Sequence, residues 1–540
     1  MVNYFLGLDC STQSLTALLI DFESKKIIYK HSINYDIDLP HYHTKNGIIT
    51  SNDTKVIHSY PLMWVEALDI HFELMKGKKI QLQEIKAISG SGQQHGTVYL
   101  NHKFEKKLET LQSNELIVDQ ISDCFTRKSS PIWMDSSTSK QCEEIRSTLG
   151  GMIGTVKLTG SNTFERFSGP QIRKFYQEHP EKYQKTSIIH LVSSYMASIL
   201  LGRNAPIDHG DGSGMNLMNI ETKQWDTRAL EATAPSLIEK LPTLAHSYDT
   251  IGKISPYFVE KYGFHPDTLL ITWSGDNPNS LIGTGVINKG KAAISLGTSD
   301  TYFSYLEFLM LDLNGEGHVF GAPTGDYMSL ICYKNGSLAR ENIKDKFNLN
   351  WAQFSEVLKA TPPGNYGKII LPYFYPEIVP LVLEPKVYRF GLEEDDLEGN
   401  IRAIIECQFL SMRLHSEWIK EKPEEIYATG GASVNREILQ VAADVFNTKV
   451  RYFEVTNSAA LGAALRSAKS YYDNIKSSKN WSEIINNFIN IQQSDVILPN
   501  IKYKELYDMM LELYRKTEDF ILKDGINPDS FRRKFIKEFY

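Results

Sequence analysis

A short pattern occurs twice in the chain, and this repeat constrains the possible fold more than any other feature of the sequence. The first copy is residues 6–12 (LGLDCST) and the second is residues 294–300 (ISLGTSD). Each copy follows an apolar stretch, places glycine and hydroxyl residues in a tight turn, and precedes a second apolar stretch, which is typical of a β-hairpin. Repetition of one supersecondary unit predicts a chain made of two related halves.

Between the two copies, a helical pattern alternates with strand-like stretches. Residues 62–75 carry apolar side chains three and four positions apart, which predicts a helix. The apolar residues 85–88 then run into the glycine-rich stretch GSGQQHG, which predicts a strand followed by a loop. Helix, strand and glycine-opened loop therefore recur along the chain.

The length of 540 residues predicts two to four domains, at about 100–200 residues per domain. Gly252, Pro256 and Gly263 interrupt the pattern before a new apolar strand at residues 269–273, so we place a domain boundary there. The expected domains are 1–255, 256–470 and a helical extension at 471–540. We expect this extension to be peripheral, because its composition shifts to Asn, Lys, Ser and Ile.

Charge and cysteine content exclude several classes of partner. With 58 Lys and Arg against 65 Asp and Glu, the formal charge is −7, so we expect no nucleic acid and no anionic membrane as partner. No run of about 18 apolar residues occurs, and residues 1–10 contain Asp9 and no basic residue, unlike a signal peptide. The five cysteines form no CxxC pair, which predicts reduced thiols and a cytoplasmic protein.

The two repeated turns are candidate phosphate sites. Backbone N–H groups and hydroxyls converge in such turns without bulky side chains, so Ser11, Thr12, Gly297 and Thr298 could clamp one triphosphate. Asp9, at the end of its strand, could hold Mg²⁺ through water, because Mg²⁺ binds few carboxylates and keeps much of its hydration. The alternative for each turn is an ordinary hairpin.

A third candidate turn is Gly430-Gly431, between an apolar strand and an amphipathic helix within residues 425–443. Glycines there allow a ligand to approach the backbone closely, which is a general design for nucleotide contact. The same sequence is also a simple way to turn from a strand into a helix, and it lacks the GxxxxGK[ST] pattern of a Walker A loop.

Asp276 and Asn277 open the stretch DNP directly after an apolar strand. A polar residue before proline is a common helix start, so capping is one interpretation. In the other, Asp276 is the base that accepts a hydroxyl proton during phosphoryl transfer, while Asn277 caps the helix. His95 and Arg166 are donors suited to polyol oxygens, or else ordinary surface residues.

Seven motifs in order carry a resemblance to a known family: GLDCST, GSGQQHG, ERFSG, DGSGMNL, SGDNPNSL, ISLGTSD and ATGGASVNREIL. Together they resemble the FGGY carbohydrate kinases, in particular the eukaryotic xylulokinase branch, over residues 4–468. The resemblance implies an α/β fold of two actin-like or hexokinase-like (ribonuclease H-like) domains around a central cleft. ATP would bind mainly to the second domain and the ketose mainly to the first.

The resemblance also assigns roles to residues. It implies that Asp276 is the general base, that Asp9 lies at the metal and phosphates, and that the second phosphate turn holds Gly297 and Thr298. The sugar would contact His95, Arg166, Asp276 and Asn277. The nucleotide would contact Gly430, Gly431, Asn435 and, near the adenine, Trp351.

The sequence departs from the broader family at four positions. Ser11 stands where the first turn often has glycine, and Gln94 stands where many bacterial members have methionine. Gln171 and Lys174 stand where the general family signature has lysine and tryptophan. The departures at Gln171 and Lys174 concern which acceptor sugar the resemblance implies.

The expected reaction is transfer of the γ-phosphoryl group of ATP to the 5-hydroxyl of D-xylulose, with Mg²⁺ as metal. The alternatives are a kinase for ribulose, gluconate or glycerol, and a catalytically inactive sugar sensor, since actin-like folds also serve other functions. A homodimer is compatible with the resemblance.

Overall fold

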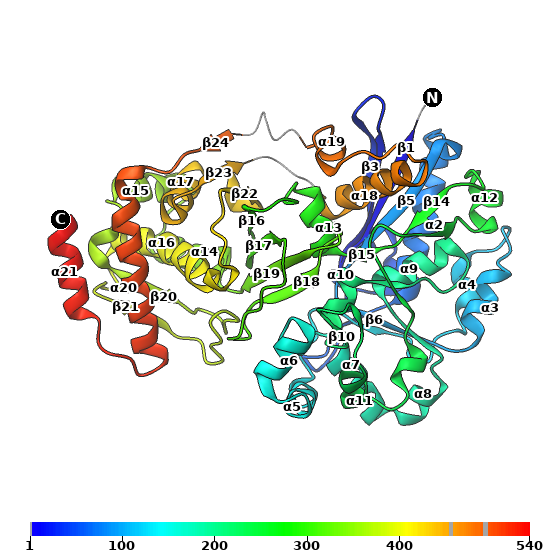
Figure 1. The fold of residues 1–540 in the computed structure, drawn as a ribbon, viewed down its shortest axis with the longest axis horizontal. Helices are drawn as coiled ribbons and strands as arrows, with labels where there is room; N and C mark the ends of the chain where they lie inside the picture. The colour runs from blue at the N-terminus through cyan, green and yellow to red at the C-terminus, as the bar shows by residue number, and fades with distance from the viewer. Residues whose placement is uncertain (1–2, 453–456, 490–494) are drawn as a thin grey trace.

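The computed structural model describes residues 3–452, 457–489 and 495–540, which form two lobes side by side (Figure 1). The sheet of the first lobe has the strand order β13-β14-β5-β1-β2-β3, with β15 paired to β5. Its strands are β1 (Tyr4–Cys10), β2 (Ser14–Asp21), β3 (Lys26–Asn34), β5 (Ile85–Gly92), β13 (Thr250–Lys253), β14 (Leu269–Ile271) and β15 (Ser274–Gly275).

The sheet of the second lobe has the order β18-β19-β17-β16-β22-β23-β24. Its strands are β16 (Lys291–Leu296), β17 (Asp300–Leu306), β18 (His318–Gly321), β19 (Tyr327–Tyr333), β22 (Glu425–Thr429), β23 (Lys449–Tyr452) and β24 (Asp495–Ile497). In each sheet the repeated motif forms an antiparallel hairpin, β1–β2 or β16–β17, whose first strand also pairs in parallel with β5 or β22. This common topology confirms the two related halves predicted from the repeat and the expected α/β fold of two domains.

Helices cover both faces of the first sheet, which explains why β1 is apolar almost throughout. Leu6 and Leu8 pack with helices α2 (Pro61–Gly77) and α9 (Val192–Leu201). Phe5 points to the opposite face and packs against α18 (Ser458–Asn474). Because successive side chains of a strand alternate between faces, one apolar strand serves two cores.

Helix α18 lies between β23 and β24 of the second sheet in sequence but packs on β1 and β5 of the first (Figure 1). It crosses α13 (Asp276–Gly283), and glycines make this crossing close. A Cβ atom on Gly462 would lie 1.9 Å from the carbonyl oxygen of Asn279, and one on Gly283 would lie 1.9 Å from that of Ser458. The two helices therefore touch backbone to backbone between the lobes.

Smaller elements extend each lobe. Those outside the first sheet are α1 (Tyr35–Asp38), β4 (His58–Ser59), β6 (Thr97–Leu100), α3 (Lys103–Glu109), α4 (Ile117–Ile121), β7 (Ser130–Pro131), α5 (Ser139–Thr148), α6 (Gly151–Thr159), α7 (Ser168–Glu178), α8 (Pro180–Lys185), β8 (Ile188–Leu191), β9 (Ile207–Asp208), α10 (His209–Gly212), η3 (Ser213–Met215), α11 (Thr227–Thr233) and α12 (Pro256–Tyr262). The second lobe adds α14 (Ser337–Lys346), α15 (Trp351–Ala360), β20 (Ile369–Pro372), β21 (Val387–Phe390), α16 (Leu397–His415), η7 (Gly431–Val434), α17 (Arg436–Phe446), α20 (Lys504–Leu522) and α21 (Asp529–Phe539).

The expectation that residues 471–540 are peripheral is wrong. Helix α20 packs on α16, and its apolar face joins the main core of the second lobe. The buried Tyr507 hydroxyl donates to Glu406 Oε1 (2.7 Å) and accepts from Arg402 Nη2 (2.7 Å). Helix α19 (Trp481–Ile485) instead packs with α18 on the first lobe, so this extension contributes to both cores.

The division placed at residue 255 also differs from the sheets. Strands β14 and β15, at residues 269–275, pair with β5 and complete the first sheet. The change from one sheet to the other comes between α13 and β16.

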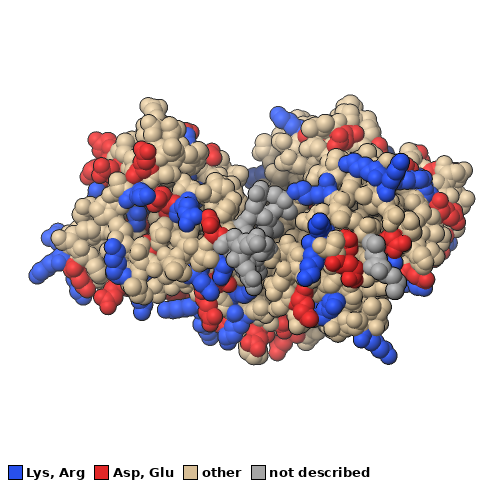
Figure 2. Space-filling model, turned by 90° about the horizontal axis from the view of Figure 1, so that it is seen from above, with Lys and Arg blue, Asp and Glu red and all other residues tan. Residues whose placement is uncertain are grey.

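No helix among the described residues has the length and apolar character needed to span a bilayer. On the face seen in Figure 2, basic side chains are interspersed with acidic ones.

Candidate active site

Asp276 lies at the carboxyl end of β15, where α13 begins. Its Oδ1 accepts hydrogen bonds from the backbone N–H of Asn277 (2.9 Å) and from Asn277 Nδ2 (3.1 Å). Burial raises the pKa of the half-buried Asp276 carboxyl to about 6, although backbone N–H groups of Asn277 and Gln94 act against this. A carboxylate with a pKa near neutrality is suited to accept and release a proton.

The capping interpretation of the DNP stretch is wrong. Helix α13 begins at Asp276 itself, its N-cap is Gly275, and no side chain caps it. Asn277 does not cap the helix either, because its Nδ2 donates to Gln94 Oε1 (2.7 Å) as well as to Asp276. The two polar side chains are therefore held by each other and by the neighbouring loop.

Asp9 lies near the end of β1. Strand β5 separates β1 from β15, the strand that leads into Asp276. Asp9 pairs with Ser91 of β5, and the two residues of β15 pair with Ser91 and Gly92, so the carboxyl ends of these three strands meet. Burial raises the pKa of Asp9 to about 7; the Ser91 hydroxyl opposes this shift and the charge of Asp276 adds to it. Asp9 Oδ1 is buried and has no hydrogen-bond partner among the described residues.

This orphaned oxygen is a suitable ligand for a hydrated Mg²⁺ ion. Among the described residues, no cluster of three or more His, Cys, Asp or Glu side chains could hold a metal ion by itself. Mg²⁺ commonly takes one or two carboxylates and completes its shell with water and substrate phosphates, so a single carboxylate such as Asp9 fits it.

Ser11 and Thr12 use their hydroxyls within the first turn. Ser11 Oγ donates to the carbonyl oxygen of Ser14 (2.9 Å), and Thr12 Oγ1 donates to Gln93 Oε1 (3.2 Å) and accepts from Trp133 Nε1 (2.8 Å). These contacts hold the turn beside Asp9.

His95 is buried in the loop after β5 with a left-handed backbone (φ 71°). Its Nδ1 lies 2.8 Å from the carbonyl oxygen of Gly214, and its ring stacks on Phe167 with 4.4 Å between centroids. Burial, aided by the charge of Arg166, lowers its pKa to about 3, so the ring is neutral. Nδ1 must donate to the carbonyl, which leaves Nε2 as an acceptor, whereas the sequence analysis expected a donor.

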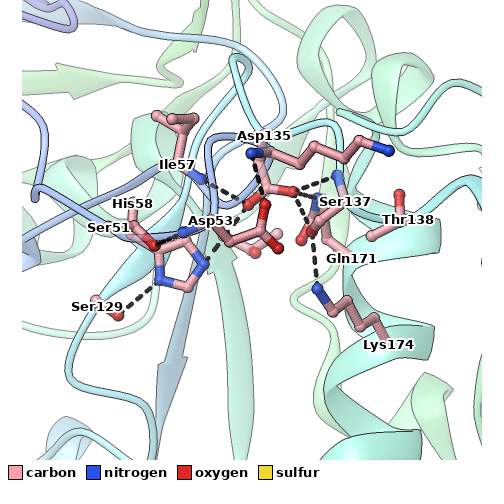
Figure 3. A network of polar contacts seen from close by, with 12 residues as sticks. Ser51, Asp53, Ile57, His58, Ser129, Asp135, Ser137, Thr138, Gln171 and Lys174 are labelled. Atoms are coloured by element: carbon pink, nitrogen blue, oxygen red, sulfur yellow. Dashed lines mark hydrogen bonds and ion pairs between the residues drawn. The ribbon is translucent and has the colours of Figure 1, made fainter.

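Asp135 is the centre of a polar network beside this site (Figure 3). The carboxylate is 1% exposed and accepts from the backbone N–H groups of Ile57 (2.9 Å) and Ser137 (3.0 Å) and from Gln171 Nε2 (2.8 Å). A buried carboxylate with this many donors is fully compensated for its lost hydration. The network joins three segments that are distant in sequence.

The same network holds the loop that carries Arg166. Gln171 Nε2 donates to the carbonyl oxygen of Glu165 (3.0 Å), which also accepts from Thr138 Oγ1 (2.6 Å). Lys174 Nζ donates to Ser137 Oγ (2.8 Å). Gln171 and Lys174, which depart from the family signature, therefore support the backbone next to Arg166.

Two residues near Asp276 were not among the site residues predicted from the sequence. Asp211, on α10, accepts from Ser193 Oγ (2.5 Å), and its buried Oδ1 has no partner among the described residues. Burial raises its pKa well above the usual value, and the charges of Asp208 and Asp276 raise it further. Gln94 is the second, since it accepts from Asn277. Both lie in quoted motifs, DGSGMNL and GSGQQHG, so the signal was present but unassigned.

A cavity of about 510 Å³ lies in the second lobe at the end of β16. Five predicted nucleotide contacts meet in its wall: Gly297, Thr298, Trp351, Gly431 and Asn435. Ser11 and Thr12 are not among its described lining residues, so the two phosphate turns do not share this cavity. Its volume is in the range of small-molecule sites, about 300–1,000 Å³.

Local structure explains the open wall of the cavity. Gly430 has φ 88°, and a Cβ there would lie 2.6 Å from the carbonyl oxygen of Leu296, whereas a Cβ on Gly431 would meet no atom within 4 Å. Asn435 caps α17 by accepting from Ile438 N (3.3 Å). Trp351 begins α15 and is 41% exposed, so part of its ring is accessible, and Lys344 Nζ lies 5.6 Å from the ring centroid.

The fold and the site together define a two-lobed kinase, with carboxylates at the strand ends of one lobe and a glycine-walled cavity in the other. The chain belongs to the FGGY family of carbohydrate kinases: the family's N-terminal domain matches residues 4–283 and its C-terminal domain matches residues 292–471. The chain is therefore a carbohydrate kinase.

Two relatives match over most of the chain. "Xylulose kinase 2" of Arabidopsis thaliana is 44% identical over 500 residues, which are 88% of each chain. "Xylulose kinase" of Rattus norvegicus is 39% identical over 534 residues, which are 97% of this chain and 98% of the rat protein.

Solved structures share the fold at lower identity. The xylulose kinase from Rhodospirillum rubrum superposes with a TM-score of 0.82 at 16% identity, covering 98% of this chain and 100% of that one. Gluconate kinase from Lactobacillus acidophilus reaches 0.81 at 21% identity over 96% and 98% of the two chains. Kinases named for different acceptors thus share this fold.

Proposed function

We propose that this carbohydrate kinase transfers the γ-phosphoryl group of ATP to the 5-hydroxyl of D-xylulose, forming D-xylulose 5-phosphate. The names of relatives that are 39–44% identical over most of the chain support xylulose as the acceptor. One structural arrangement supports the chemistry: the half-buried Asp276 carboxylate lies at the carboxyl end of β15, close to Asn277 and Gln94, and burial raises its pKa to about 6.

In this proposal the first lobe binds the sugar. Both Nδ2 hydrogens of Asn277 go to Asp276 and Gln94, so Asn277 offers its Oδ1 to a sugar hydroxyl. His95 Nε2 accepts from a second hydroxyl, and Arg166 donates to a sugar oxygen. Asp276 takes the proton of the attacking hydroxyl as the phosphoryl group arrives.

Asp9 is the proposed Mg²⁺ residue, through its unpartnered Oδ1. Bound Mg²⁺ would neutralise charge on the transferring phosphates. Ser11 and Thr12 shape the turn around Asp9, and the N–H groups of Gly297 and Thr298 face phosphate from the other lobe. Exclusion of water from the closed site favours transfer to the sugar over hydrolysis.

The adenine is proposed to stack on Trp351, with Gly430, Gly431 and Asn435 beside the nucleotide. Base–aromatic stacking contributes about 1–3 kcal/mol, so Trp351→Ala should raise the KM for ATP about tenfold. The KM for the sugar should stay unchanged. Phe308→Ala is the matched control, since Phe308 is 63% exposed on the same lobe but does not line the cavity. Equal KM values for ATP in both variants would contradict the assignment.

The proposed base also predicts a pH dependence. Because the carboxylate is the active form, kcat/KM for the sugar should fall about tenfold per pH unit below the pKa. Burial raises the pKa of Asp276 to about 6, so the acid limb should lie near pH 6. Enzyme held at low pH and returned to pH 8 controls for unfolding. A limb near the ordinary value of 3.8 would contradict Asp276 as the base.

The test of function is ATP consumption with D-xylulose, ribulose, gluconate and glycerol, each with and without Mg²⁺. We expect the highest kcat/KM with D-xylulose and loss of activity without the metal. A higher kcat/KM for another acceptor would identify that acceptor as the substrate in place of D-xylulose. Sugar binding without ATP turnover would support the alternative of an inactive sugar sensor.

The cytoplasm is the proposed compartment, because all five cysteines are unpaired thiols and four are buried. A homodimer is proposed on the resemblance alone, and light scattering of the purified protein tests it.

A further inference from the structure

Strand β18 is the edge of the second sheet, yet it packs on the first lobe. The backbone N–H of Val319 donates to the carbonyl oxygen of Gly160 (3.0 Å), and that of Gly321 donates to Ser213 Oγ (3.1 Å). Figure 1 shows β18 beside α10, on the side of the second lobe that faces the first. This strand brings His318 of one lobe next to the sugar residues of the other.

His318 contacts Arg166 across this boundary. Its Nε2 lies 3.1 Å from Arg166 Nη2, and a guanidinium can only donate, so the imidazole accepts. The His318 ring is 0% exposed, and burial together with the charge of Arg166 lowers its pKa well below the usual value. The ring is therefore neutral and carries its proton on Nδ1.

Packing alone does not explain a histidine at this position. The ring lies 5.6 Å from that of Phe320 in a stacked arrangement and 4.7 Å from that of Phe164. Phenylalanine would fill the same aromatic space. Histidine instead leaves its Nδ1 donor buried without a partner among the described residues, which is unfavourable. The acceptor at Nε2 is what histidine adds.

That acceptor determines the orientation of Arg166. A guanidinium is a planar fork of five donors, so holding one Nη sets the plane of the rest. Arg166 lies 5.9 Å from the centroid of the Phe167 ring, on which the His95 ring stacks, so Arg166 and His95 are near neighbours. The loop beneath Arg166 is held by Gln171 and Thr138 from the first lobe. The guanidinium lies over the first-lobe ring of Phe164 at 5.3 Å and is hydrogen-bonded to His318 of the second lobe.

We propose that His318 is a positioning residue for the acceptor sugar, supplied by the second lobe, which orients Arg166 for sugar binding only while the two lobes are in contact. The proposal rests on Arg166 binding the acceptor in the proposed function. Sugar binding and lobe contact then strengthen each other by the same factor, because coupling between two equilibria is reciprocal.

The test compares variants that keep or remove the acceptor atom. His318→Phe keeps the ring and removes the acceptor, so we expect the KM for the sugar to rise about tenfold and the KM for ATP to change less than about threefold. His318→Gln places an amide oxygen near the Nε2 position and should restore the KM for the sugar to within about threefold of wild type. Phe320→Leu, which alters the packing and keeps the acceptor, is the matched control.

A double-mutant cycle separates this role from a structural one. If His318 acts through Arg166, then His318→Phe should have no further effect on the KM for the sugar in an Arg166→Met background. Additive effects would overturn the proposal, as would equal losses in His318→Phe and Phe320→Leu. If His318→Phe fails to fold, the comparison of His318→Gln with the shorter His318→Asn makes the same distinction.

The acceptor in these assays is the sugar that the wild-type enzyme phosphorylates best. If D-xylulose is not a substrate, the double-mutant cycle is measured with whichever sugar the wild-type enzyme phosphorylates best. The two proposals can therefore fail separately. A wild-type protein that binds a sugar without ATP turnover is measured by the dissociation constant of the sugar in place of KM.

Discussion

Asp276→Asn is expected to lower kcat by ~10²–10⁴ while the dissociation constant of the sugar stays within about tenfold of wild type. The amide has the same shape and its oxygen can still accept from the backbone N–H of Asn277, so binding is largely kept. It cannot take up the proton of the attacking hydroxyl, so the loss falls on the chemical step.

Coupled ADP release measures kcat, and calorimetry measures sugar binding. Asp267→Asn is the matched control, because Asp267 is an exposed carboxylate in the same lobe, paired with Lys253 on the surface. Near-normal turnover in Asp276→Asn would refute the base assignment. If sugar binding were lost to the same degree as turnover, Asp276 would be assigned to sugar binding and not to catalysis.

Gly462→Ala is expected to destabilise the fold by about 3 kcal/mol, since overpacking in a closely packed core costs about 1–3 kcal/mol or more. The added Cβ would lie 1.9 Å from the carbonyl oxygen of Asn279 on α13. Backbone atoms cannot rotate away, so α18 and α13 must separate. Because Asp276 begins α13, kcat should also fall, by up to about 10²-fold for a displacement of about 1 Å.

Urea unfolding measures the first effect and steady-state kinetics the second. Gly77→Ala is the control, because a Cβ on Gly77 would meet no atom within 4 Å and the change should be neutral or stabilise by up to about 1 kcal/mol. If Gly462→Ala unfolded at the same urea concentration as Gly77→Ala, the close helix crossing would be excluded.

Local sequence patterns correctly predicted helices and strands in which each face meets a single environment. The helix expected at 62–75 is α2, and the two repeated motifs are the hairpins β1–β2 and β16–β17. The tail was interpreted wrongly for a physical reason. An amphipathic helix such as α20 shows in sequence that it needs an apolar partner, but the partner, α16, lies about a hundred residues earlier.

The sequence predicted which types of residue lie at the candidate site, but it could not predict their protonation states. A neutral His95 with Nε2 as its acceptor depends on the carbonyl of Gly214, and the raised pKa of Asp276 depends on its burial in the folded protein. Gln171 was recognised only as a departure from a family pattern, yet it holds the loop before Arg166.

By itself the sequence determined the duplicated hairpins, the alternation of helix and strand, and the set of polar turns proposed to carry the chemistry, because each depends on residues within about twenty positions of one another. Only the tertiary structure decided which of these turns share a pocket, which lobe each helix stabilises, and which nitrogen of a histidine carries its proton. Those outcomes depend on burial and on contacts between segments, some of them more than four hundred residues apart. The electrostatics of a buried group is set by all the atoms around it.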